Sequence, residues 1–269
     1  MPTVSPSDLP PLDFVRLAPP PGSRIAVLGG CGGLGQALVR AAADIGLHVA
    51  VLDLQRSLDR HPPPVEALAI PVDATDAAAV DGAFDAVAEA FGGLDTLVTL
   101  VGVTAVPPRR IEAFSPEEWD ALLAVNLRSA FLACRAALPL LRKGDNPSIV
   151  TVSSLHAALP PEGFGPYGAA KAALVNLTKG LALENAPAIR ANSVAPSGML
   201  TPFIGGGTGR GGEEGPIDWL DIAAIERATP LGRMARPEDV VGPILFLAGP
   251  AGRYITGQLL HVSGGRIMP

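Results

Sequence analysis

The chain has 269 residues, of which 48% are hydrophobic and 17% charged, and its formal net charge is −6. This composition suits a large α/β domain with a buried core, and the acidic balance argues against nucleic acid or an anionic membrane as a partner. No uncharged apolar run reaches the roughly 18–20 residues of a membrane span, and the N-terminus does not have the pattern of a secretory signal. We therefore expect neither a membrane anchor nor a leader.

Cysteine and histidine usage argues against disulfides and metal. The two cysteines, Cys31 and Cys134, lie far apart and form no CxxC pattern. The chain has four scattered histidines: His48, His61, His156 and His261. We expect no metal site and a reducing cytoplasmic setting.

The residues fall into alternating strand-like and helix-like segments after a proline-rich start. Residues 1–23 end in "APPPG" and predict an irregular arm. Short apolar runs predict strands at 24–29, 48–54, 69–75, 94–103, 147–154, 189–197 and 257–265. Helical spacing predicts helices at 34–46, 76–93, 115–144, 167–185 and 236–249.

This alternation predicts an α/β fold with a parallel, doubly wound, seven-stranded sheet and helices on both faces. The strands are almost uniformly apolar, as expected when both faces of the sheet are covered. A single domain over 24–269 follows, with ligands bound beyond the carboxyl ends of the strands. The glycine-rich stretch 202–218 interrupts the rhythm, and we expect a substrate lid over 202–228 or a disordered insertion.

The glycines between Leu28 and Gln36 lie where the first strand gives way to a helix, which is a setting for binding pyrophosphate. They allow two registers. One is G-x-G-x-x-G, formed by Gly30, Gly32 and Gly35, and the other is G-x-x-x-G-x-G, formed by Gly29, Gly33 and Gly35.

Two acidic residues end the next two predicted strands. Asp53 stands 18 residues after Gly35, where a carboxylate would accept hydrogen bonds from ribose hydroxyls. Because Leu54 follows it instead of a basic residue, NAD is favoured over NADP; the alternative is a plain strand-end turn. Asp73 either accepts from an adenine amino group or caps a helix that starts at Thr75.

Four polar residues form a candidate catalytic set. Tyr167 and Lys171 are spaced i, i+4 and share one helix face. Ser154 lies 13 residues before Tyr167, at the end of a predicted strand. Asn126 lies in the middle of the helical segment 115–144, where asparagine is a mediocre helix former. A lone Y-x-x-x-K is common on solvated helices, so the argument depends on the set as a whole.

Taken together, these features resemble the short-chain dehydrogenase/reductase family over residues 24–266. The tail "PLGRMARPEDVVGPILFLAGPAGRYITGQLLHVSGG" is similar to the last helix and strand of that family. The resemblance implies a single-domain Rossmann-like fold, NAD as cofactor and a homotetramer or homodimer paired through the helices of Asn126 and Tyr167. It selects the register Gly29, Gly33 and Gly35. The cofactor-binding positions it implies are Gly29, Gly33, Leu34, Gly35, Asp53, Leu54, Asp73, Ala74, Thr99, Gly102, Tyr167, Lys171, Met199 and Thr201.

The resemblance also implies a mechanism. Tyr167 exchanges a proton with the substrate oxygen while a hydride moves to or from the nicotinamide. Lys171 and an oxidised nicotinamide would favour the phenolate, whose free pKa is about 10. Ser154 would hydrogen-bond the substrate oxygen, and Lys171 would also hold the nicotinamide ribose. Asn126 would orient a water that links Lys171 to solvent.

The sequence departs from the family pattern at four places. Thr99-Leu100-Val101-Gly102 replaces N-N-A-G, and we expect Thr99 to keep one hydrogen bond. Leu28 replaces a threonine before the first glycine. Pro196-Ser197 replaces P-G, although Thr201 still matches the residue that contacts the carboxamide. Ser263 replaces an acidic residue of the closing strand.

Substrate contacts are less constrained. His156 either lines the pocket or lies on the surface. Met199, Phe203 and Trp219 form an apolar wall, unless Trp219 serves the lid or a subunit contact. Arg210 lies near Glu213 and Glu214, which favours a solvated loop over a carboxylate site, and the glycines of 205–212 suggest a lid that orders on binding.

Three functions remain open at this point. The first is an NAD-dependent dehydrogenase for a secondary alcohol or ketone of a small or medium molecule, cyclic ones included. The second is an NADPH-dependent biosynthetic ketoreductase of the 3-oxoacyl-carrier type. The third is a non-catalytic dinucleotide-binding subunit.

For the glycine register we expect Gly35→Val to abolish cofactor binding and Gly30→Ala to be far milder.

Overall fold

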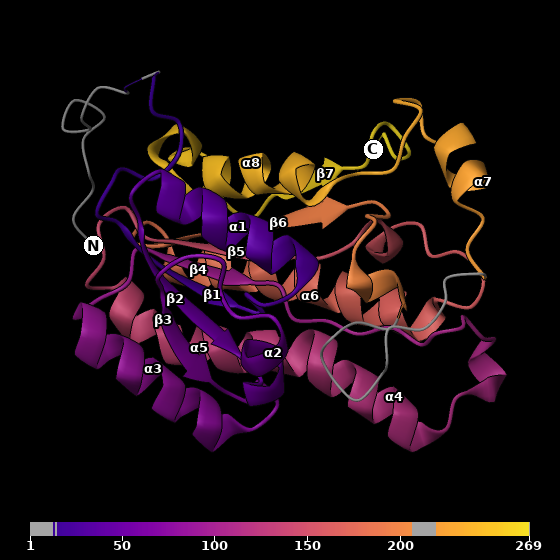
Figure 1. The fold of residues 1–269 in the computed structure, drawn as a ribbon, viewed down its shortest axis with the longest axis horizontal. Helices are drawn as coiled ribbons and strands as arrows, with labels where there is room; N and C mark the ends of the chain where they lie inside the picture. Colours follow the sequence, from indigo (N-terminus) through magenta and orange to yellow (C-terminus); the bar gives the residue numbers. More distant parts are fainter. Residues whose placement is uncertain (1–12, 14, 206–218, 269) are drawn as a thin grey trace.

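A computed structural model describes residues 13, 15–205 and 219–268. Its centre is a seven-stranded sheet in the order β3-β2-β1-β4-β5-β6-β7, with every neighbouring pair parallel. The strands are β1 (Arg24–Leu28), β2 (His48–Asp53), β3 (Leu68–Pro71), β4 (Thr96–Thr99), β5 (Ser148–Val152), β6 (Arg190–Pro196) and β7 (Leu259–Val262). The predicted doubly wound, seven-stranded sheet is confirmed (Figure 1).

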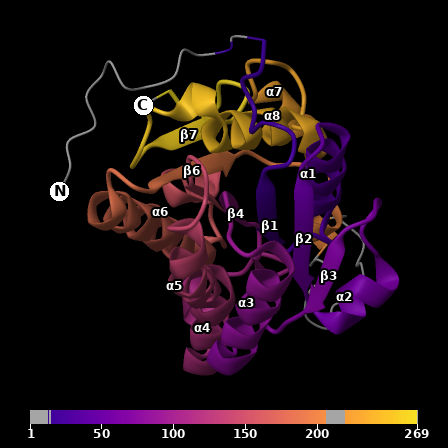
Figure 2. The ribbon, with the colours of Figure 1, turned by 90° about the vertical axis from the view of Figure 1, so that its left-hand side faces the viewer.

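Helices cover both faces of this sheet (Figures 1 and 2). One layer holds α1 (Gly33–Asp44) and α8 (Pro237–Ala248). The other holds α3 (Ala77–Phe91), α4 (Pro116–Leu123), α5 (Ser129–Leu141) and α6 (Gly165–Asn185). The short helices α2 (Gln55–Arg60) and α7 (Ile222–Arg227) were not predicted, because six residues cannot display a clear apolar stripe.

The unalternated apolar strands have a direct physical reason. Within β1, Ala26 and Leu28 belong to the hydrophobic core under α3 and α5, whereas Ile25 and Val27 belong to the core under α1 and α8. Successive side chains of a strand point to opposite faces, so a sheet with two covered faces needs apolar residues at every position.

The predicted helix over 115–144 is interrupted. A capping box begins it, in which Ser115 accepts from the Glu118 backbone and Glu118 accepts from that of Ser115. A π-helical turn, η3 (Ala124–Arg128), then separates α4 from α5. This continuous stretch, Pro116–Leu141, is the one described helix long and apolar enough to span a bilayer, but half of its most apolar window is buried inside the protein, as in a core helix.

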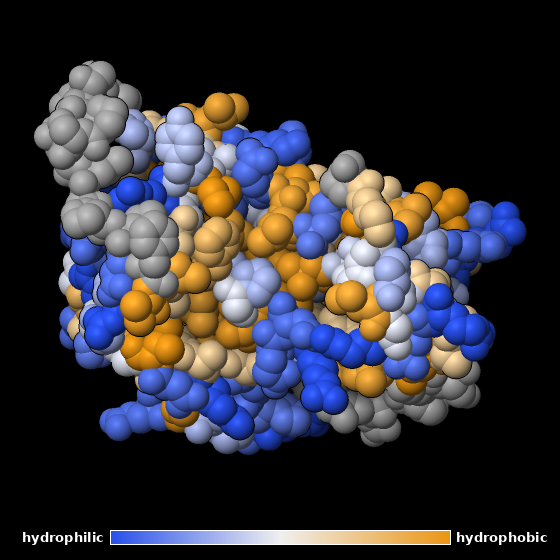
Figure 3. Space-filling model, turned by 90° about the horizontal axis from the view of Figure 1, so that it is seen from above, coloured by the Kyte–Doolittle hydropathy of each residue, from blue (hydrophilic) through white to orange (hydrophobic). Residues whose placement is uncertain are grey.

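The described end of the predicted N-terminal arm lies outside helices and strands but packs on the body. Gly22 donates to the carbonyl of Gly46, and His48 donates to that of Ser23. Most of the arm, residues 1–12 and 14, lies outside the described residues. Figure 3 shows the adjoining face above α8, where a band of apolar side chains runs between polar margins.

Candidate active site

A cavity of about 540 Å³ lies at the carboxyl ends of the strands. Its lining includes Gly29 after β1, Asp53 at the end of β2, Leu100 after β4 and Ser154 after β5. Parallel strands all end at this edge, so residues far apart in the sequence meet there. This is the position that the fold prediction assigned to a ligand.

In the glycine turn after β1, Gly29, Gly33 and Gly35 each lie where a side chain would crowd a neighbouring segment. Gly29 has a φ of +88°, and a Cβ there would lie 3.0 Å from the backbone N of Val101. At Gly33, a Cβ would lie 2.9 Å from the Cβ of Thr201, and at Gly35 it would lie 2.6 Å from the carbonyl oxygen of Gly30. Only glycine lets α1, the turn and the Thr201 segment approach this closely.

The other two glycines of the turn differ from expectation. A Cβ on Gly30 would lie 2.8 Å from Cγ1 of Val51, in the middle of buried β2. Gly30→Ala is therefore not a mild change, because a core valine would have to move. Gly32 is the permissive position, since the nearest atom to its Cβ would be 3.7 Å away.

The N-terminus of α1 faces the cavity without a side-chain cap. Its N-cap residue is Gly32, and Gly32, Gly33 and Leu34 all contribute to the cavity lining. The first N–H groups of a helix have no intrahelical acceptor and carry the positive end of its dipole. A phosphate-bearing ligand fits such a cradle.

Asp53 ends β2 and is fixed by two backbone donors. Its Oδ2 accepts from the N–H of Cys31 at 2.9 Å, and its Oδ1 accepts from its neighbour Leu54 at 2.8 Å. The carboxylate thus ties the glycine turn to β2 and also lines the cavity, as does Leu54. Each oxygen keeps a lone pair for a hydroxyl donor.

Asp73 and Ala74 also line the cavity. Asp73 accepts from the backbone N–H of Thr75 at 2.9 Å and from its hydroxyl at 2.7 Å, which closes a local turn. The alternative that Asp73 caps the following helix is wrong. That helix, α3, is capped by Asp76, whose side chain accepts from two N–H groups of its first turn.

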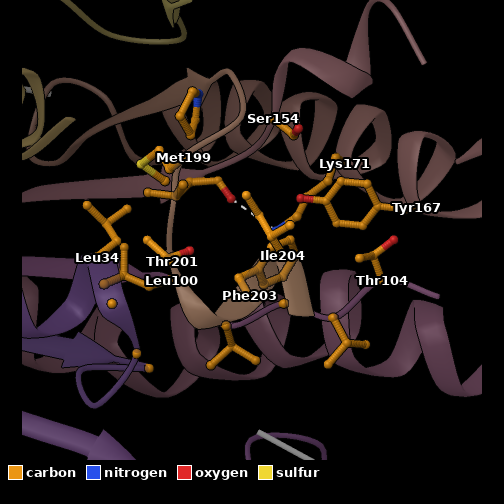
Figure 4. Close-up of a pocket in the computed structure, with 18 of the residues that line it drawn as sticks. Leu34, Leu100, Thr104, Ser154, Tyr167, Lys171, Met199, Thr201, Phe203 and Ile204 are labelled. Atoms are coloured by element: carbon orange, nitrogen blue, oxygen red, sulfur yellow. Dashed lines mark hydrogen bonds between the residues drawn. The ribbon is translucent and has the colours of Figure 1, made fainter. Parts of the chain in front are cut away.

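Tyr167 and Lys171 project from α6 into the cavity beside Ser154 (Figure 4). Burial raises the pKa of Tyr167 to about 12, and a hydrogen bond with Ser154 acts in the opposite direction. The Nζ of Lys171 donates to the carbonyl of Val152 at 3.1 Å, and burial lowers the pKa of this amine to about 8. The sequence predicted a lowered pKa for Tyr167. In the protein without cofactor the pKa is raised instead, because the effect of burial is larger than that of the hydrogen bond with Ser154.

Asn126 sits in the π-helical turn η3 and is fully buried. Its Nδ2 donates to the carbonyls of Val103 at 2.8 Å and Leu122 at 2.9 Å. Its Oδ1 accepts from the N–H of Val103 at 3.1 Å. The side chain therefore fastens the segment after β4 to the long helix.

The segment after β4 shows how the altered N-N-A-G motif is accommodated. A Cβ on Gly102 would lie 2.9 Å from Oδ1 of Asn126 and 3.2 Å from Nζ of Lys171, so only glycine fits. The hydroxyl of Thr99 is buried and has no hydrogen-bond partner in the described structure, so the bond expected for it is absent. Thr99 also lies outside the cavity lining, whereas Leu100 and Gly102 belong to it.

The remaining predicted cofactor positions, Met199 and Thr201, lie across the cavity from the tyrosine. Figure 4 shows Leu34, Leu100 and Thr201 on one side and the catalytic candidates on the other, with Phe203 and Ile204 between. Phe203 packs against Tyr167, with ring centroids 6.0 Å apart. Met199, Phe203 and Trp219, the residues predicted to form an apolar wall, all line the cavity.

The cavity lining contains residues that sequence reasoning missed. His156 lines the cavity, as one of its two interpretations predicted, and so does Arg266, which was not considered. Arg266 follows two glycines of positive φ, Gly264 and Gly265, which signal a sharp turn after β7. Arg210, Glu213, Glu214 and all but the first of the glycines in 205–212 lie outside the described residues.

Comparison with known proteins agrees with this geometry. A family model described as enoyl-(acyl carrier protein) reductase matches residues 30–266. A 2,5-dichloro-2,5-cyclohexadiene-1,4-diol dehydrogenase of Sphingobium indicum is 35% identical over 251 residues, which cover 91% of this chain and 96% of that protein. A cis-4-hydroxycyclohexanecarboxylate dehydrogenase of Sinomonas cyclohexanicum is 32% identical, over 90% of this chain and 96% of that one.

Solved structures give the same result. A Brucella melitensis protein described as a short-chain dehydrogenase/reductase superposes with a TM-score of 0.84 and 28% identity, covering 94% of this chain and 99% of its own. A 3-ketoacyl-(acyl-carrier-protein) reductase from Brucella melitensis, complexed with NADH, has a TM-score of 0.81 and 29% identity, covering 92% of this chain and 99% of its own. The chain therefore belongs to the short-chain dehydrogenase/reductase family of oxidoreductases, whose members bind a nicotinamide dinucleotide.

Proposed function

We propose that this protein oxidises a secondary alcohol to a ketone, or catalyses the reverse reaction, with NAD(H) as the hydride carrier. In the oxidative direction the alcohol loses a hydride from carbon and a proton from oxygen, giving the ketone, NADH and a proton. The substrate is a small or medium molecule, cyclic ones included. The observation that carries this proposal is the convergence of Ser154, Tyr167 and Lys171 on the cavity that the glycine turn also lines.

The cradle for the cofactor is built from backbone and one carboxylate. The uncapped N-terminus of α1 fits pyrophosphate, and Asp53 fits a ribose diol while repelling a 2′-phosphate, which favours NAD over NADP. Asp73 and Ala74 would adjoin the adenine, and Thr201 and Lys171 the nicotinamide riboside. When bound, the oxidised nicotinamide accepts the hydride and adds a positive charge near the phenol.

Tyr167 acts as the general base in oxidation and the general acid in reduction. Its buried phenol, with a pKa raised to about 12, holds its proton in the protein alone and so suits ketone reduction. Oxidation needs the phenolate, which positive charge at Lys171 and in the loaded cleft stabilises. The Ser154 hydroxyl holds the substrate oxygen, and Asn126 fixes the backbone beside Lys171. Asn126 would also orient a water molecule that links Lys171 to solvent.

A substrate panel tests the function. Secondary alcohols, including cyclic ones, are incubated with NAD or NADP, and NADH or NADPH absorbance is followed. We expect turnover with NAD, and a higher KM for NADP than for NAD. Tighter binding of NADP would instead support the biosynthetic ketoreductase. Absence of any turnover, together with no effect of Tyr167→Phe, would support the non-catalytic subunit.

Variants of Asp53 test whether its negative charge, and not its hydrogen bonds to the backbone, causes the preference for NAD over NADP. Asp53→Asn keeps an oxygen that accepts from the Cys31 N–H but loses the negative charge, whereas Asp53→Ala loses both. We expect Asp53→Asn to reduce the preference for NAD over NADP with a smaller loss of melting temperature than Asp53→Ala, because asparagine keeps one of the two acceptors for the Cys31 and Leu54 N–H groups. If the preference were unchanged, the carboxylate would not be its cause.

We also propose a homotetramer or homodimer that pairs through the long helices. A shallow apolar groove runs between η3, α5 and α6, lined by Leu127, Phe131, Ala173 and Leu177. Phe131 is 47% exposed there, which is costly for a large apolar side chain in the monomer. Sedimentation velocity giving a monomer would refute this assembly.

A reducing cytoplasm is the proposed setting, because both cysteines are free thiols.

A further inference from the structure

The cavity extends past Tyr167 along a line of aromatic rings. The centroid of His156 lies 5.8 Å from that of Tyr167 in an edge-on arrangement, and Phe164 lies 4.8 Å beyond it. Trp219 continues the line, 6.3 Å from Phe164. This line starts at the reacting phenol and leads away from it, so it forms the wall against which the body of a substrate would lie.

Two buried polar atoms on this wall have no partner. Nδ1 of His156 and Nε1 of Trp219 are both buried and make no hydrogen bond in the described structure. Leaving a buried polar atom unpaired is unfavourable, so such atoms in a binding cleft point to a polar group of the ligand. An indole N–H can only donate, so that ligand group must accept.

Arg266 adds a positive charge at the same place. Its side chain lines the cavity, and its guanidinium forms no ion pair or hydrogen bond with the described residues. Burial lowers the pKa of the His156 imidazole to about 4, and the nearby charge of Arg266 acts in the same direction. His156 is therefore neutral at pH 7, and Arg266 supplies the charge.

The chain is folded so as to hold Arg266 there. Gly264 has a φ of +61° and Gly265 a φ of +89°, and Cβ atoms on them would lie 2.7 Å from Cγ2 of Thr229 and 2.8 Å from Cγ of Pro230. The N–H of Leu231 donates to the carbonyl of Gly264 at 3.1 Å. This close turn brings the residue after it back over the cleft.

The acidic residues that line the cavity do not neutralise Arg266. Asp53 and Asp73 lie at the ends of β2 and β3, where they are held by backbone donors. Glu162 is the third carboxylate of the lining, but its side chain is 80% exposed and pairs with Arg110 at 3.5 Å. The guanidinium is thus available to a ligand.

We propose that the substrate of this dehydrogenase is a hydroxy acid whose carboxylate is bound by Arg266, with His156 and Trp219 as neighbouring contacts. This inference rests on the proposed alcohol oxidation and names its substrate class. A planar guanidinium matches the two oxygens of a carboxylate, and a single cation balances its single negative charge. The aromatic wall that starts at Tyr167 lines the same cavity as Arg266, and it fits the apolar body that joins the carboxylate to the reacting carbinol.

The first experiment compares matched substrates on the wild-type enzyme. Hydroxycyclohexanecarboxylates are assayed beside their methyl esters and carboxamides, with NAD in excess. We expect kcat/KM to favour the acids by about tenfold to hundredfold, as one charge-assisted hydrogen bond would provide, mostly through KM. Equal or lower kcat/KM for the acids would overturn the hydroxy-acid assignment and leave the alcohol dehydrogenase function intact.

The second experiment assigns the preference to Arg266. Arg266→Gln should remove most of the preference for the acids over the esters, and Arg266→Lys should keep part of that preference. The matched control is Arg40→Gln, which removes the same charge from an exposed position on α1 outside the cavity. If Arg266→Gln and Arg40→Gln behaved alike, Arg266 would not be the carboxylate site.

The third experiment does not depend on turnover. Calorimetry in the presence of NADH compares cyclohexanecarboxylate, cyclohexanecarboxamide and cyclohexanephosphonate, which have no hydroxyl to oxidise. We expect the carboxylate to bind most tightly and Arg266→Gln to weaken it by about tenfold or more. If the phosphonate bound more tightly than the carboxylate, the ligand of Arg266 would be a dianion and the hydroxy-acid proposal would be wrong. If the carboxylate bound but no alcohol were oxidised, Arg266 would still be a carboxylate site, and the proposed alcohol oxidation would be wrong.

Discussion

Asn126 and Val103 exchange two hydrogen bonds, one in each direction, between a π-helical turn and the segment that follows β4. This pair of bonds fixes the backbone beside Gly102, whose missing Cβ leaves room for Asn126 and for the Nζ of Lys171. These bonds hold the chain directly after T-L-V-G, the sequence that replaces N-N-A-G. Asn126 and Lys171 thus both lie next to Gly102, although they come from different helical segments.

Asn126→Ala should lower both stability and activity. The change leaves the N–H and carbonyl of Val103 without these partners, which predicts a loss of about 2–4 kcal/mol in the free energy of unfolding. It also loosens the backbone at Gly102 and Val103, next to the Nζ of Lys171, so kcat should fall. Urea unfolding and steady-state kinetics measure the two effects. The control is Asn185→Ala, which removes a hydrogen bond to the carbonyl of Leu181 and a long one from Arg142, both outside the cavity; equal behaviour of the two variants would contradict a positioning role.

Tyr167→Phe should abolish most turnover but keep cofactor binding. General acid–base catalysis contributes about 10²- to 10⁴-fold, and the phenyl ring preserves the packing with His156 and Phe203. Rates are followed by NADH absorbance and binding by NADH fluorescence. The chain offers a matched control in its second tyrosine, Tyr254, which is fully exposed, so that Tyr254→Phe should change neither quantity. A Tyr167→Phe enzyme with wild-type kcat would remove the tyrosine from the mechanism.

Lys171 should set the pH dependence of alcohol oxidation. Oxidation needs the phenolate of Tyr167, so its rate should rise with pH until that phenol is titrated. Lys171→Met removes a positive charge and should move the inflection to higher pH, because the phenolate is then less stabilised. Rate profiles against pH test this, with Lys179→Met, an exposed lysine of α6, as the control. An unchanged inflection would mean that Lys171 does not act on the phenol.

His156 should make the protein less stable in acid. Its pKa is lowered from 6.5 to about 4, chiefly by burial, so between these values the folded state binds fewer protons than the unfolded chain. The free energy of unfolding therefore falls as pH is lowered through that window. His156→Phe fills similar space without a titrating group, so its loss of stability between pH 7.5 and about 4.5 should be smaller, as measured by urea unfolding. An equal loss in both proteins would exclude this histidine as a source of the sensitivity.

The glycine turn should tolerate substitution at one position only. Gly32→Ala should keep NADH binding and the melting temperature, because the added carbon meets nothing closer than 3.7 Å. Gly35→Ala should lose both, since its Cβ would meet the Gly30 carbonyl at 2.6 Å. Gly30→Ala should lower the melting temperature by displacing Val51. Thermal denaturation and fluorescence titration separate these cases, and a damaging Gly32→Ala would show that the register is wrong.

Much of the fold and of the candidate site could be predicted because they depend on local pattern. Uniformly apolar strands alternating with amphipathic helices leave few architectures other than a covered parallel sheet. Tyr167 and Lys171 share a helix face by their spacing, and Asp53 and Ser154 end strands. The carboxyl ends of parallel strands meet at one edge, so the sequence order alone brought these residues to the same cleft.

Other properties depended on contacts between distant segments. Whether Gly30 or Gly32 tolerates a side chain is decided by Val51 of the neighbouring strand, and the pKa of Tyr167 is decided by how deeply α6 is buried. Arg266 is 99 residues from Tyr167 in the chain, and only the turn at Gly264 and Gly265 brings it to the substrate end of the cavity. Residue type and spacing determined the architecture and the reactive groups, whereas burial and long-range packing, which no local pattern encodes, decided their protonation and placed Arg266 in the cavity lining.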